Sequence, residues 1–556
     1  MRPAGRGELD SLYFSYPHFP PPDAAARART TFPVVIVGAG PVGLVAALTL
    51  ARAGVDSVVV ERKTTYNDGS RAICISRSSF QILDALGAVG PFLDKSLGWT
   101  RGITSFRGTP ILEFEMPHSE HDKYLPMYNL QQQYIEQFLH EATVASGRVD
   151  VRWGTTFEGL EESKDGVTIT VSDARGTYRI DAAWLLAADG ARSAVRQHLG
   201  LRLKGDNHEG RYVIADVRMR HDFPTIRRAL FDPPSNPGAT VLIHRQPDDI
   251  WRIDYQVDAG ESSESATAEE KVRAKVAAVL GDIGHKGPWE LEWWSVYSAN
   301  TLALDDYRHG RVVFIGDSAH IVPIFGVRGL NNGIADAQNI GWKLAKVIKG
   351  QAGAGLIASY TLERRGATLD VFATATKSTR FMTPPTPGWT LVRDAALSLS
   401  LKHPFARPLA NPRQMAPYDY ALSPLTQRDS EPHAGGPRPG VFAHDVQLAP
   451  GRHLLDGTGM GFTGLLLSRQ PVDPDVARVR AVDPDFRLVV ICHATDPASY
   501  DAVRSVYGET DRDSDFVLIR PDFYIAARRP GFDPTEVASF LTQLLALSYA
   551  DTRHAS

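Results

Sequence analysis

A glycine-rich turn near the start of the chain carries the residues best suited to hold a phosphate-containing cofactor. It reads Gly38-Ala39-Gly40-Pro41-Val42-Gly43 and lies between an apolar strand, residues 34–37, and a helix that ends at Gly54. The first glycine permits a tight turn, the second lets the backbone approach a pyrophosphate, and the third allows close packing of the helix. The helix N-terminus then offers free N–H groups and a positive dipole end to phosphate.

An acidic residue completes this pattern at the end of the next strand. Glu61, followed by Arg62, ends the run VDSVVVER, about twenty residues after the turn, where a carboxylate holds ribose hydroxyls. Strand, turn, helix and acid in this order predict dinucleotide binding, and the alternative is a tight structural turn without a ligand. The motif alone does not separate FAD from NAD.

A second glycine-rich turn lies far downstream and points to FAD. It begins Gly316-Asp317-Ser318-Ala319-His320 and runs on through Pro323 to Gly329-Leu330-Asn331. An aspartate that closes an apolar strand can accept hydrogen bonds from a ribitol hydroxyl. Residues 329–331 lead into a helix whose exposed N–H groups would face the pyrimidine carbonyls of a flavin, where negative charge builds on reduction. We expect the two turns to converge on one FAD molecule.

Together, the two turns resemble those of the single-component (class A) FAD-dependent aromatic hydroxylases, the group of 4-hydroxybenzoate, phenol and 3-(3-hydroxyphenyl)propionate hydroxylases. A third family signature is Ala188-Asp189-Gly190-Ala191-Arg192-Ser193, which in that family is linked to both FAD and NAD(P)H. The resemblance implies no metal, and it implies FAD contacts at Gly38, Gly40, Pro41, Val42, Gly43, Glu61, Arg62, Arg71, Gln132, Asp189, Asp317, Pro323, Gly329, Leu330 and Asn331.

The flavin loop departs from the family pattern. Relatives usually carry Pro-Pro-x-Gly-Gly-Gln-Gly-Met-Asn after the histidine, whereas this chain has Pro-Ile-Phe-Gly-Val-Arg-Gly-Leu-Asn over residues 323–331. Val327 and Arg328 replace a small glycine and a neutral amide. Arg328 either brings a positive charge near the active site or points to solvent. We interpret His320 as a structural or flavin-loop residue.

The resemblance covers nearly the whole chain and implies its organisation. We expect an α/β fold in which a Rossmann-like FAD-binding domain, of the 4-hydroxybenzoate hydroxylase type, is interleaved with an antiparallel-sheet substrate domain. The C-terminal region resembles the thioredoxin-like domain of larger hydroxylases, but it has no Cys-x-x-Cys, which excludes thiol redox chemistry there and leaves a structural or dimer-contact role. The expected regions are an N-terminal extension (1–30), a first segment of the FAD-binding domain (31–205), the substrate sheet (206–300), a second FAD-binding segment with a helix (301–383), a proline-rich connector (384–439) and the thioredoxin-like domain (440–556).

Composition and charge argue against several other classes of protein. A net charge of −4 gives no electrostatic footprint for nucleic acid or an anionic membrane. Two cysteines, far apart, form neither a disulfide framework nor a cysteine-rich metal site and fit a reducing cytoplasm. The uncharged run between Arg29 and Arg52 has the length of a membrane span, but its glycines are explained by a strand, a turn and a helix.

The activity that the resemblance implies is hydroxylation of a phenolic substrate, as in aromatic catabolism. NADPH or NADH would reduce FAD, and oxygen would then form a flavin C4a-hydroperoxide that transfers OH to the ring. An alternative is a hydroxylase or epoxidase of a larger polyketide or antibiotic-type aromatic, since those enzymes share all three motifs. A third hypothesis is a flavin-binding protein without catalysis. We also expect a homodimer; ring substituents and nicotinamide preference stay open.

A phenol must lose its proton to attack a peroxide, so a proton acceptor is needed near the ring. Candidates on the expected substrate sheet are Tyr212, His244, Tyr255 and Asp254, with Arg218, Arg245 and Arg252 as carboxylate clamps. Alternation along the strand places Arg252, Asp254 and Gln256 on one face and Trp251, Ile253 and Tyr255 on the other. Alternation does not decide which face meets the flavin. For each candidate the alternative is a solvated charge or a core aromatic, and the catalytic residue stays open.

Overall fold

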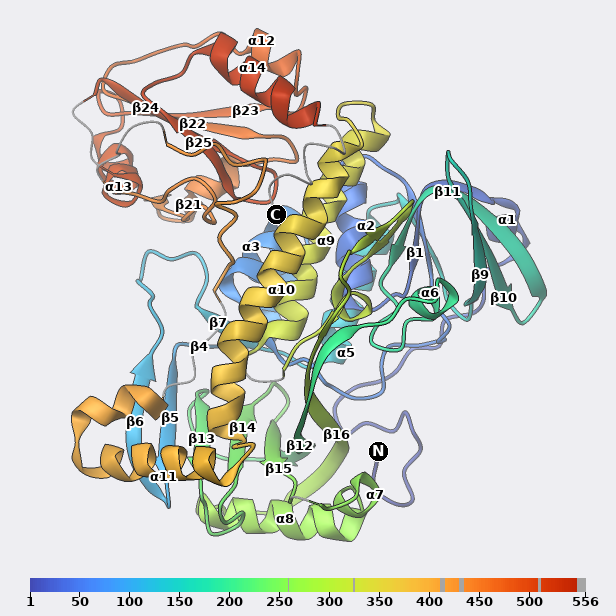
Figure 1. Ribbon diagram of the computed structural model, residues 1–556, viewed down its shortest axis with the longest axis vertical. Coiled ribbons are helices and arrows are strands. Elements are labelled where there is room, and N and C mark those ends of the chain that lie inside the picture. The colour runs from blue at the N-terminus through green and yellow to red at the C-terminus, as the bar shows by residue number, and fades with distance from the viewer. Residues whose placement is uncertain (259, 324–325, 411–415, 430–434, 509–511, 548–556) are drawn as a thin grey trace.

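The computed structural model describes residues 1–258, 260–323, 326–410, 416–429, 435–508 and 512–547. Figure 1 shows two large sheets and a C-terminal domain arranged around two long helices, α9 (Arg328–Ile348) and α10 (Gly355–Met382). The mixed α/β fold expected from the sequence is confirmed. None of the helices in the described ranges combines the length and the apolar character needed to cross a membrane.

The first sheet has the strand order β17-β18-β11-β1-β2-β8, with β10 and β9 extending from β11. Neighbours β18, β11, β1, β2 and β8 run parallel. Apolar strands such as residues 34–37 suit this position because parallel strands are buried on both faces. The strands are β1 (Thr31–Val37), β2 (Ser57–Val60), β8 (Val149–Arg152), β9 (Thr156–Glu162), β10 (Val167–Asp173), β11 (Gly176–Ala187), β17 (Arg308–His309) and β18 (Val312–Phe314).

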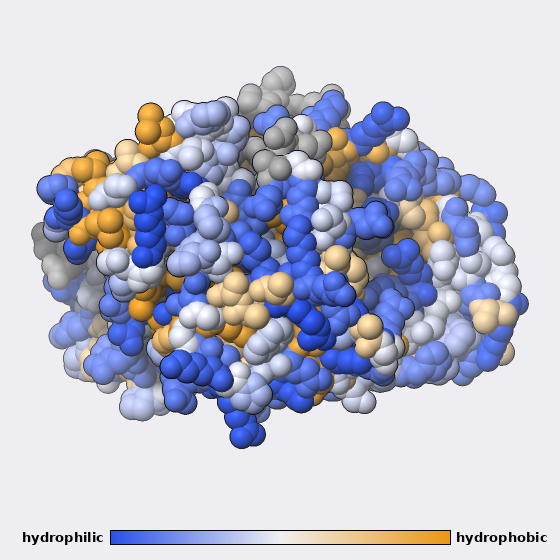
Figure 2. Space-filling view, turned by 90° about the horizontal axis from the view of Figure 1, so that it is seen from below, coloured by the Kyte–Doolittle hydropathy of each residue, from blue (hydrophilic) through white to orange (hydrophobic). Residues whose placement is uncertain are grey.

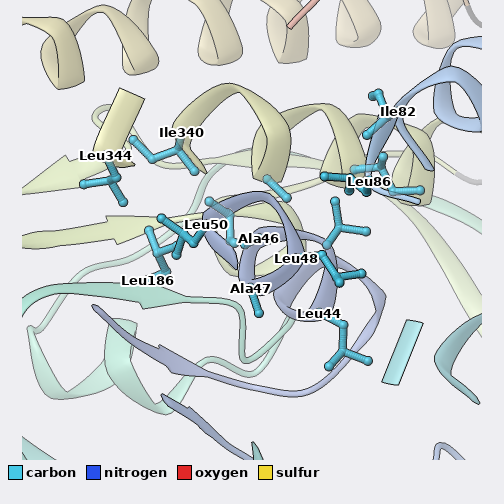
Figure 3. Close-up of a cluster of buried hydrophobic side chains, with 14 of the residues drawn as sticks. Leu44, Ala46, Ala47, Leu48, Leu50, Ile82, Leu86, Leu186, Ile340 and Leu344 are labelled. Carbon is cyan, nitrogen blue, oxygen red and sulfur yellow. The ribbon is translucent and has the colours of Figure 1, made fainter. Parts of the chain in front are cut away.

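Helix α2 (Pro41–Arg52) packs between this sheet and α9. Figure 3 shows Leu50 of α2 between Leu186 of β11 and Ile340 of α9, with Leu44 and Leu48 farther along the same helix. All residues of α2 from Gly43 to Ala51 are buried. Burial on every side explains why the segment is uncharged over a length that also suits a membrane span.

The second sheet has the order β19-β16-β12-β15-β14-β13-β5-β6. Its central strands come from the range expected for the substrate domain, but β5 and β6 come from residues assigned to the first segment of the FAD-binding domain. β5 joins by parallel pairing with β13, a long-range contact that local sequence patterns do not encode. The strands are β5 (Arg101–Phe106), β6 (Thr109–Glu115), β12 (Lys204–Met219), β13 (Arg227–Phe231), β14 (Thr240–Arg245), β15 (Ile250–Gln256), β16 (Trp289–Ala303) and β19 (His320–Ile321).

Short elements link the two sheets. A small sheet of order β3-β7-β4 lies beside the N-terminus of α9. Two helices, α7 and α8, cover the outer face of the second sheet. The bounds are β3 (Cys74–Ser76), β4 (Leu97–Trp99), β7 (Met127–Asn129), α3 (Arg77–Ala85), α4 (Val89–Lys95), α5 (Gln132–Ala145), α6 (Ala194–His198), α7 (Ser263–Ala266), α8 (Glu269–Asp282) and η1 (Gly316–Ser318).

The proline-rich range 384–439 is not a plain connector. It contains α11 (Pro387–Lys402) and the 3-10 helix η2 (Pro404–Ala410). Pro387 occupies the first turn of α11, where its missing N–H costs no hydrogen bond, and Thr386 caps the helix by accepting from the Trp389 N–H. High proline content therefore marked a helix start here.

The C-terminal domain is built on a four-stranded sheet of order β23-β22-β24-β25, in which only β22 and β23 are parallel. Its elements are β20 (Gln447–Ala449), β21 (Arg452–His453), η3 (Leu454–Gly457), β22 (Thr463–Ser468), α12 (Ala477–Arg480), β23 (Arg487–Cys492), α13 (Pro497–Tyr507), β24 (Ser514–Ile519), β25 (Ile525–Arg529) and α14 (Pro534–Leu545). Cys74 and Cys492 are both free and buried.

The N-terminal extension lies against both sheets, and its one helix is α1 (Ala24–Ala28). Glu292 of β16, which is 1% exposed, accepts hydrogen bonds from Arg2, Arg6, Ser11 and the Leu12 N–H. Aromatic contacts continue along the extension, for example the Phe19 ring stacked on Trp153 at 4.5 Å. A buried carboxylate that accepts from four donors fixes this segment against β16 of the second sheet.

Candidate functional site

The three glycines of the first turn have different steric surroundings. Gly38 has φ +108°, and an added Cβ would lie 2.5 Å from the Ala188 carbonyl oxygen. A Cβ on Gly43 would lie 2.0 Å from the Gly38 oxygen. Gly40 differs, because a Cβ there would meet no atom within 4 Å. Gly38 and Gly43 are therefore required by packing, and Gly40 leaves open space at the N-terminus of α2, where no side chain caps the helix.

Glu61 lies beside this turn. Its carboxylate accepts hydrogen bonds from the Ala39 N–H at 2.9 Å and from the Lys63 N–H at 3.0 Å. The residue is half-buried, and Arg62 next to it is exposed. The acid at the end of β2 and the glycine turn at the end of β1 thus meet at one edge of the sheet, as parallel pairing requires.

The second turn reaches the same edge. A Cβ on Gly316 would lie 3.1 Å from a Val42 methyl carbon, and one on Gly333 of α9 would lie 2.5 Å from it. The two turns therefore touch through Val42. Asp317 follows β18 and is exposed, while Asp189 follows β11, the neighbouring strand.

Asp189 is only partly satisfied. One carboxylate oxygen accepts from the Val195 N–H at 3.1 Å, and the other is buried without a partner among the described residues. Burial raises the pKa of Asp189. An unsatisfied acceptor at this edge is expected where a hydroxyl-bearing ligand binds.

His320 belongs to a buried ionic cluster behind the second turn. Its Nε2 lies 2.6 Å from Asp336, which also accepts from Arg364 at 2.6 Å and from the Gly316 N–H at 3.0 Å. Burial acts to raise the pKa of Asp336, but the charges of Arg364 and His320 outweigh it and lower the pKa. The cluster anchors the turn to α9, which is consistent with a structural role for His320.

Gln132 and Arg252 hold the loop that carries Arg71. Gln132 accepts from the N–H groups of Arg71 and Ala72, both at 3.2 Å. Arg252, from the second sheet, donates to the carbonyl of Arg71 at 3.0 Å and to that of Ser70. The Arg71 side chain is exposed, so its guanidinium is accessible while its backbone is fixed from two sides.

The N-terminus of α9 is also fixed by its side chains. Asn331 accepts from the Ser76 N–H at 2.9 Å and donates to the Cys74 carbonyl at 3.1 Å, so its amide is used within the protein. Val327 takes the left-handed conformation, with φ +57°, just before the helix. Pro323 is buried, and Ile324 and Phe325 lie outside the described residues.

Arg328 does not point to solvent, so that alternative is wrong. The side chain is 6% exposed and donates to the Thr374 hydroxyl of α10 at 2.6 Å. Burial lowers the pKa of Arg328, with opposition from Asp370. The charge that replaces the family's neutral amide is directed to α10.

The structure decides which face of the second sheet is turned toward the second glycine turn. Trp251, Ile253 and Tyr255 pack with α8 on the outer face. Tyr255 is therefore on the outer face, and the alternation rule places Arg252 and Asp254 on the inner face. Tyr297 also faces inward, since its hydroxyl donates to the Val322 carbonyl at 3.3 Å.

Two of the three predicted clamps are elsewhere. Arg218 is exposed and bonds Leu12 and Glu290, and Arg245 donates to the Phe223 carbonyl on the outer side. Arg252 faces inward, but its guanidinium is occupied by Asp216, at 2.8 and 2.9 Å, as well as by the Arg71 loop. None of these three arginines is free to bind a substrate carboxylate, because each one contacts a partner within the protein. Strand position alone did not reveal those partners.

The remaining proton-acceptor candidates differ in chemistry. The Tyr212 hydroxyl lies 2.8 Å from that of Thr383, in a cluster with α10 and α11, and burial raises the Tyr212 pKa. Burial, then the charges of Arg227 and Arg252, lower the pKa of His244 to about 3.

Asp254 has the pKa best matched to a base. Burial raises the pKa of Asp254 to about 7, against the charge of Arg252. One of its oxygens has no partner among the described residues, and the side chain is half-buried. Among the inner-face candidates, Asp254 alone combines a free acceptor atom with a pKa near neutrality.

Arg227 was absent from the candidates drawn from the sequence. It is 5% exposed, and its Nη1 has no partner among the described residues. Arg227 alternates with Ala229 and Phe231 along β13, and these two residues pack in the same cluster as Leu242. This alternation could have placed Arg227 on the inner face. That signal was missed because residues 227–231 were not recognised as a strand of the sheet.

Comparison with known proteins decides the family. The profile described as FAD binding domain matches residues 31–375, more than half of the chain. The chain belongs to this FAD binding domain family. The residues present fit FAD, since Gly40 faces open space beside a helix N-terminus and an Asp189 oxygen lacks a partner at the same sheet edge.

Two relatives are named 3-(3-hydroxy-phenyl)propionate/3-hydroxycinnamic acid hydroxylase. One, from Mycobacterium sp. (strain JLS), is 30% identical over 375 residues, which cover 67% of this chain and 64% of the relative. The other, from Burkholderia cenocepacia (strain HI2424), is 28% identical over 525 residues and covers 90% of this chain and 95% of the relative. The alignments to the first relatives span slightly less than two thirds of their length.

Solved structures share the fold over nearly the whole chain. The flavin-dependent monooxygenase PieE, in complex with FAD and substrate, has a TM-score of 0.75 and 23% identity, with 95% of this chain and 99% of that chain covered. OxyS anhydrotetracycline hydroxylase from Streptomyces rimosus has a TM-score of 0.67 and 26% identity, with 91% and 98% covered. The resemblance to class A flavin hydroxylases inferred from the motifs is confirmed.

Proposed function

We propose that the protein is an FAD- and NAD(P)H-dependent monooxygenase that hydroxylates a phenolic aromatic substrate with molecular oxygen. The observation that carries this proposal is the meeting of the two glycine turns at Val42. The second turn also contacts the inner face of the second sheet, where the Tyr297 hydroxyl donates to the Val322 carbonyl. The names of the two hydroxylase relatives support the reaction class.

The predicted cofactor residues would contact different parts of FAD. The N–H groups that follow Gly40 would hold the pyrophosphate, and Glu61 with Arg62 would hold the ribose. Asp189, Asp317 and Pro323 would line the ribitol and ring, with Arg71 and Gln132 on the loop opposite. The N-terminus of α9, at Gly329, Leu330 and the Asn331 N–H, would face the pyrimidine side of the ring. FAD, when bound, supplies hydride acceptance from NAD(P)H and the activation of oxygen.

Asp254 would remove the phenolic proton. Its unpaired oxygen can accept a hydrogen bond from the ring hydroxyl, and deprotonation makes the ring carbons electron-rich at the position attacked. The apolar cluster of Ile73, Cys74, Trp99, Met116 and Met127, together with partly buried Val327, would keep water from the ring.

Reconstitution with FAD followed by a substrate panel tests this function. The expected result is a bound-flavin spectrum and NADH or NADPH oxidation that depends on a phenol and yields a hydroxylated product. Absence of flavin absorbance after reconstitution would overturn the proposal. Bound FAD that neither nicotinamide reduces, with any aromatic present, would favour a non-catalytic flavoprotein.

A second candidate function is hydroxylation or epoxidation of a larger polyketide-type aromatic. It is favoured by the likeness to OxyS anhydrotetracycline hydroxylase over 91% of the chain. The same panel separates the two candidates, because a polyketide enzyme would couple nicotinamide oxidation to product only with the larger compounds.

We further propose that the C-terminal domain is thioredoxin-like. Its elements run β22, α12, β23, α13, β24, β25 and α14, with the first two strands parallel and the last two antiparallel. This βαβαββα order, with β22 and β24 central, is the arrangement expected of that fold and supports the assignment.

The predicted homodimer is proposed to form through α11 and η2. Figure 2 views the molecule from this end, where apolar residues gather at the left side. Large exposed apolar side chains on these two helices are Trp389 (39%), Leu391 (71%), Val392 (56%), Leu399 (43%), Leu401 (40%), Phe405 (75%) and Leu409 (62%). A concentration of exposed apolar side chains on adjacent helices is typical of a contact surface.

The double change Leu391→Glu and Phe405→Glu should convert a dimer to a monomer, because it places charges in the apolar contact. Light scattering after size exclusion gives the mass directly. Leu422→Glu, at a residue 62% exposed but outside these helices, is the matched control and should leave the mass unchanged. A monomeric wild type, or a double variant that stays dimeric, would contradict the assignment.

A further inference from the structure

A large cleft lies between the C-terminal domain and the helices α2, α3 and α9 (Figure 1). Its volume is about 800 Å³, which is within the usual range of small-molecule sites, and such sites are common where two domains meet. The three helices form one wall, and the segments 445–460, 480–487 and 521–523 form the other. The cleft is separate from the candidate cofactor site, because none of the predicted FAD contacts is among the described residues that line it.

Three polar side chains of the helical wall are buried without hydrogen-bond partners. Gln81 of α3 is 9% exposed and Gln338 of α9 is 6% exposed, and neither amide has a partner among the described residues. Trp342, one turn after Gln338, is 1% exposed, and its Nε1 likewise has no partner in the part of the chain that the structure describes. All three residues line the cleft. Buried polar groups are normally hydrogen-bonded, so these three require a ligand or water from the cleft.

Apolar side chains from both walls adjoin these polar groups. Leu86, just beyond α3, lies on the helical wall, and Met460 and Phe523 lie on the wall of the C-terminal domain. Side-chain amides can bind the hydrogen-bonding edge of a planar ring, while apolar and aromatic side chains contact its faces. The inner part of the cleft therefore suits a nitrogen heterocycle such as a nucleobase.

The carboxylates of the cleft are already used within the protein. Lys123 pairs with one carboxylate from each wall, Asp84 of α3 and Asp456 of the C-terminal domain. Asp485 pairs with a lysine of α9 at 3.2 Å. Asp445 accepts from two backbone N–H groups, at 2.9 and 3.0 Å. Each of these four carboxylates thus has a partner of its own.

The three arginines of the cleft have no carboxylate partner within the described ranges. Arg52, at the end of α2, forms no ion pair or hydrogen bond there. Arg480 donates to the Phe486 carbonyl at 3.2 Å, and Arg487 donates to the Thr458 carbonyl at 2.9 Å. All three arginines are exposed. Arginine binds phosphate oxygens through its planar fork, so the outer part of the cleft suits a phosphate group.

We propose that the cleft binds a nucleoside phosphate, with the base at Gln81, Gln338 and Trp342 and the phosphate at the three arginines. This inference does not rest on the hydroxylase function. Gln338 follows Gly329, the residue proposed to face the flavin, by nine residues of α9, which is about 14 Å along the helix axis. A base held there would not touch the flavin ring, so the bound nucleotide is an effector and not the hydride donor.

The test titrates AMP, GMP and UMP into FAD-saturated protein and measures binding by isothermal calorimetry and by the melting temperature. Inorganic phosphate and the nucleoside of the tightest nucleotide are the partial ligands. Saturation with FAD fills the dinucleotide site, where a nucleotide could otherwise bind. If the protein takes up no FAD, the proposed function fails, and titration of Gly40→Val, in which the first glycine turn is blocked, still tests the cleft.

Three variants assign the binding to the cleft. Gln338→Leu removes a buried amide, and Arg52→Met removes an unpaired cation. Arg202→Met, at an exposed arginine outside the cleft, is the matched control. None of these three side chains forms a hydrogen bond in the described part of the chain, so all three variants should fold.

We expect one nucleotide to bind once per chain and to raise the melting temperature, because it binds only the folded protein. Its nucleoside and inorganic phosphate should bind at least about tenfold more weakly, since each lacks half of the contacts. Gln338→Leu and Arg52→Met should each weaken the nucleotide by about three- to tenfold, the effect of about one hydrogen bond. Gln338→Leu should also weaken the nucleoside, Arg52→Met should not, and Arg202→Met should change neither ligand.

Three outcomes would overturn the inference. They are the absence of saturable binding for all three nucleotides, inorganic phosphate that binds as tightly as the nucleotide, and wild-type nucleotide affinity in either cleft variant.

Discussion

Asp254→Asn should lower kcat/KM for a phenolic substrate by about 100- to 1000-fold, the usual contribution of a positioned proton acceptor. The amide keeps the size of the side chain but cannot take the proton. Flavin binding should be unchanged, because the residue lies on β15 of the second sheet and not at either glycine turn. Steady-state turnover with product analysis measures the effect.

The pKa of Asp254 also predicts the direction in which kcat/KM changes with pH. Burial raises the pKa of Asp254 to about 7, so the basic form is populated only as pH rises through that value. The charges facing it are Arg252, Asp216 and Arg227, and neighbouring His244 is neutral there because its pKa is lowered to about 3. We expect kcat/KM to rise with pH across about 7 in wild type and to lose this limb in Asp254→Asn.

Stability provides an independent readout. A carboxyl whose pKa is raised by folding stabilises the native state at low pH and loses that contribution as pH rises through the folded value. Asp254→Asn should therefore be more thermostable than wild type above pH 8. Asp258→Asn, at an exposed residue just beyond β15, is the control and should change neither rate nor stability. A normal rate in Asp254→Asn would exclude this residue as the proton acceptor.

Glu363→Ala should remove about 3–5 kcal/mol from the free energy of unfolding, the range for breaking a buried ion pair. Glu363 of α10 is 2% exposed and accepts from Lys343 of α9 at 2.6 Å and from Arg520 of the C-terminal domain at 2.6 and 3.0 Å. Its loss leaves two buried cations without their shared anion. Denaturant unfolding followed by tryptophan fluorescence measures the change.

Low pH should lower the free energy of unfolding for the same reason as Glu363→Ala. Burial acts to raise the pKa of Glu363, but the charges of Arg520 and Lys343 outweigh it and lower the pKa. Stability from this carboxylate is therefore present above the ordinary glutamate pKa and is lost as pH falls below it. Glu536→Gln, at a carboxylate that is 61% exposed and pairs with Arg529, should cost less than about 1 kcal/mol. A similarly small loss in Glu363→Ala would show that the C-terminal domain does not depend on this contact.

Local patterns predicted the features of the fold whose cause is local. The turn at Gly38 to Gly43 follows from glycine sterics within a few residues, and the same packing constraints are found in the structure. The mixed α/β fold and the FAD family also followed from these motifs. Helix α11 was missed because proline was taken as a break, although proline at the first turn of a helix is compatible with it.

The candidate site was less predictable because it depends on tertiary contacts. Alternation along β15 separated Arg252 from Tyr255, but only the packing of α8 decided which of the two faces inward. Arg245 and Arg218 found partners in Phe223, Leu12 and Glu290 that no spacing rule identifies. Arg520 donates to Glu363, which lies far away in the sequence, so no local pattern pairs the two residues.

The affinity for FAD in two variants, one at each glycine turn, tests the central claim most directly. Gly40→Val should fold normally, since φ is −70° and the added side chain meets open space in the protein, but it would occupy the position proposed for the pyrophosphate. Asp317→Leu removes the proposed ribitol contact at the other turn. Titration of the apoproteins, followed by flavin fluorescence, should give one FAD per wild-type chain and weaker binding in both variants at unchanged melting temperature. Wild-type affinity in either variant would contradict a single FAD held by both turns.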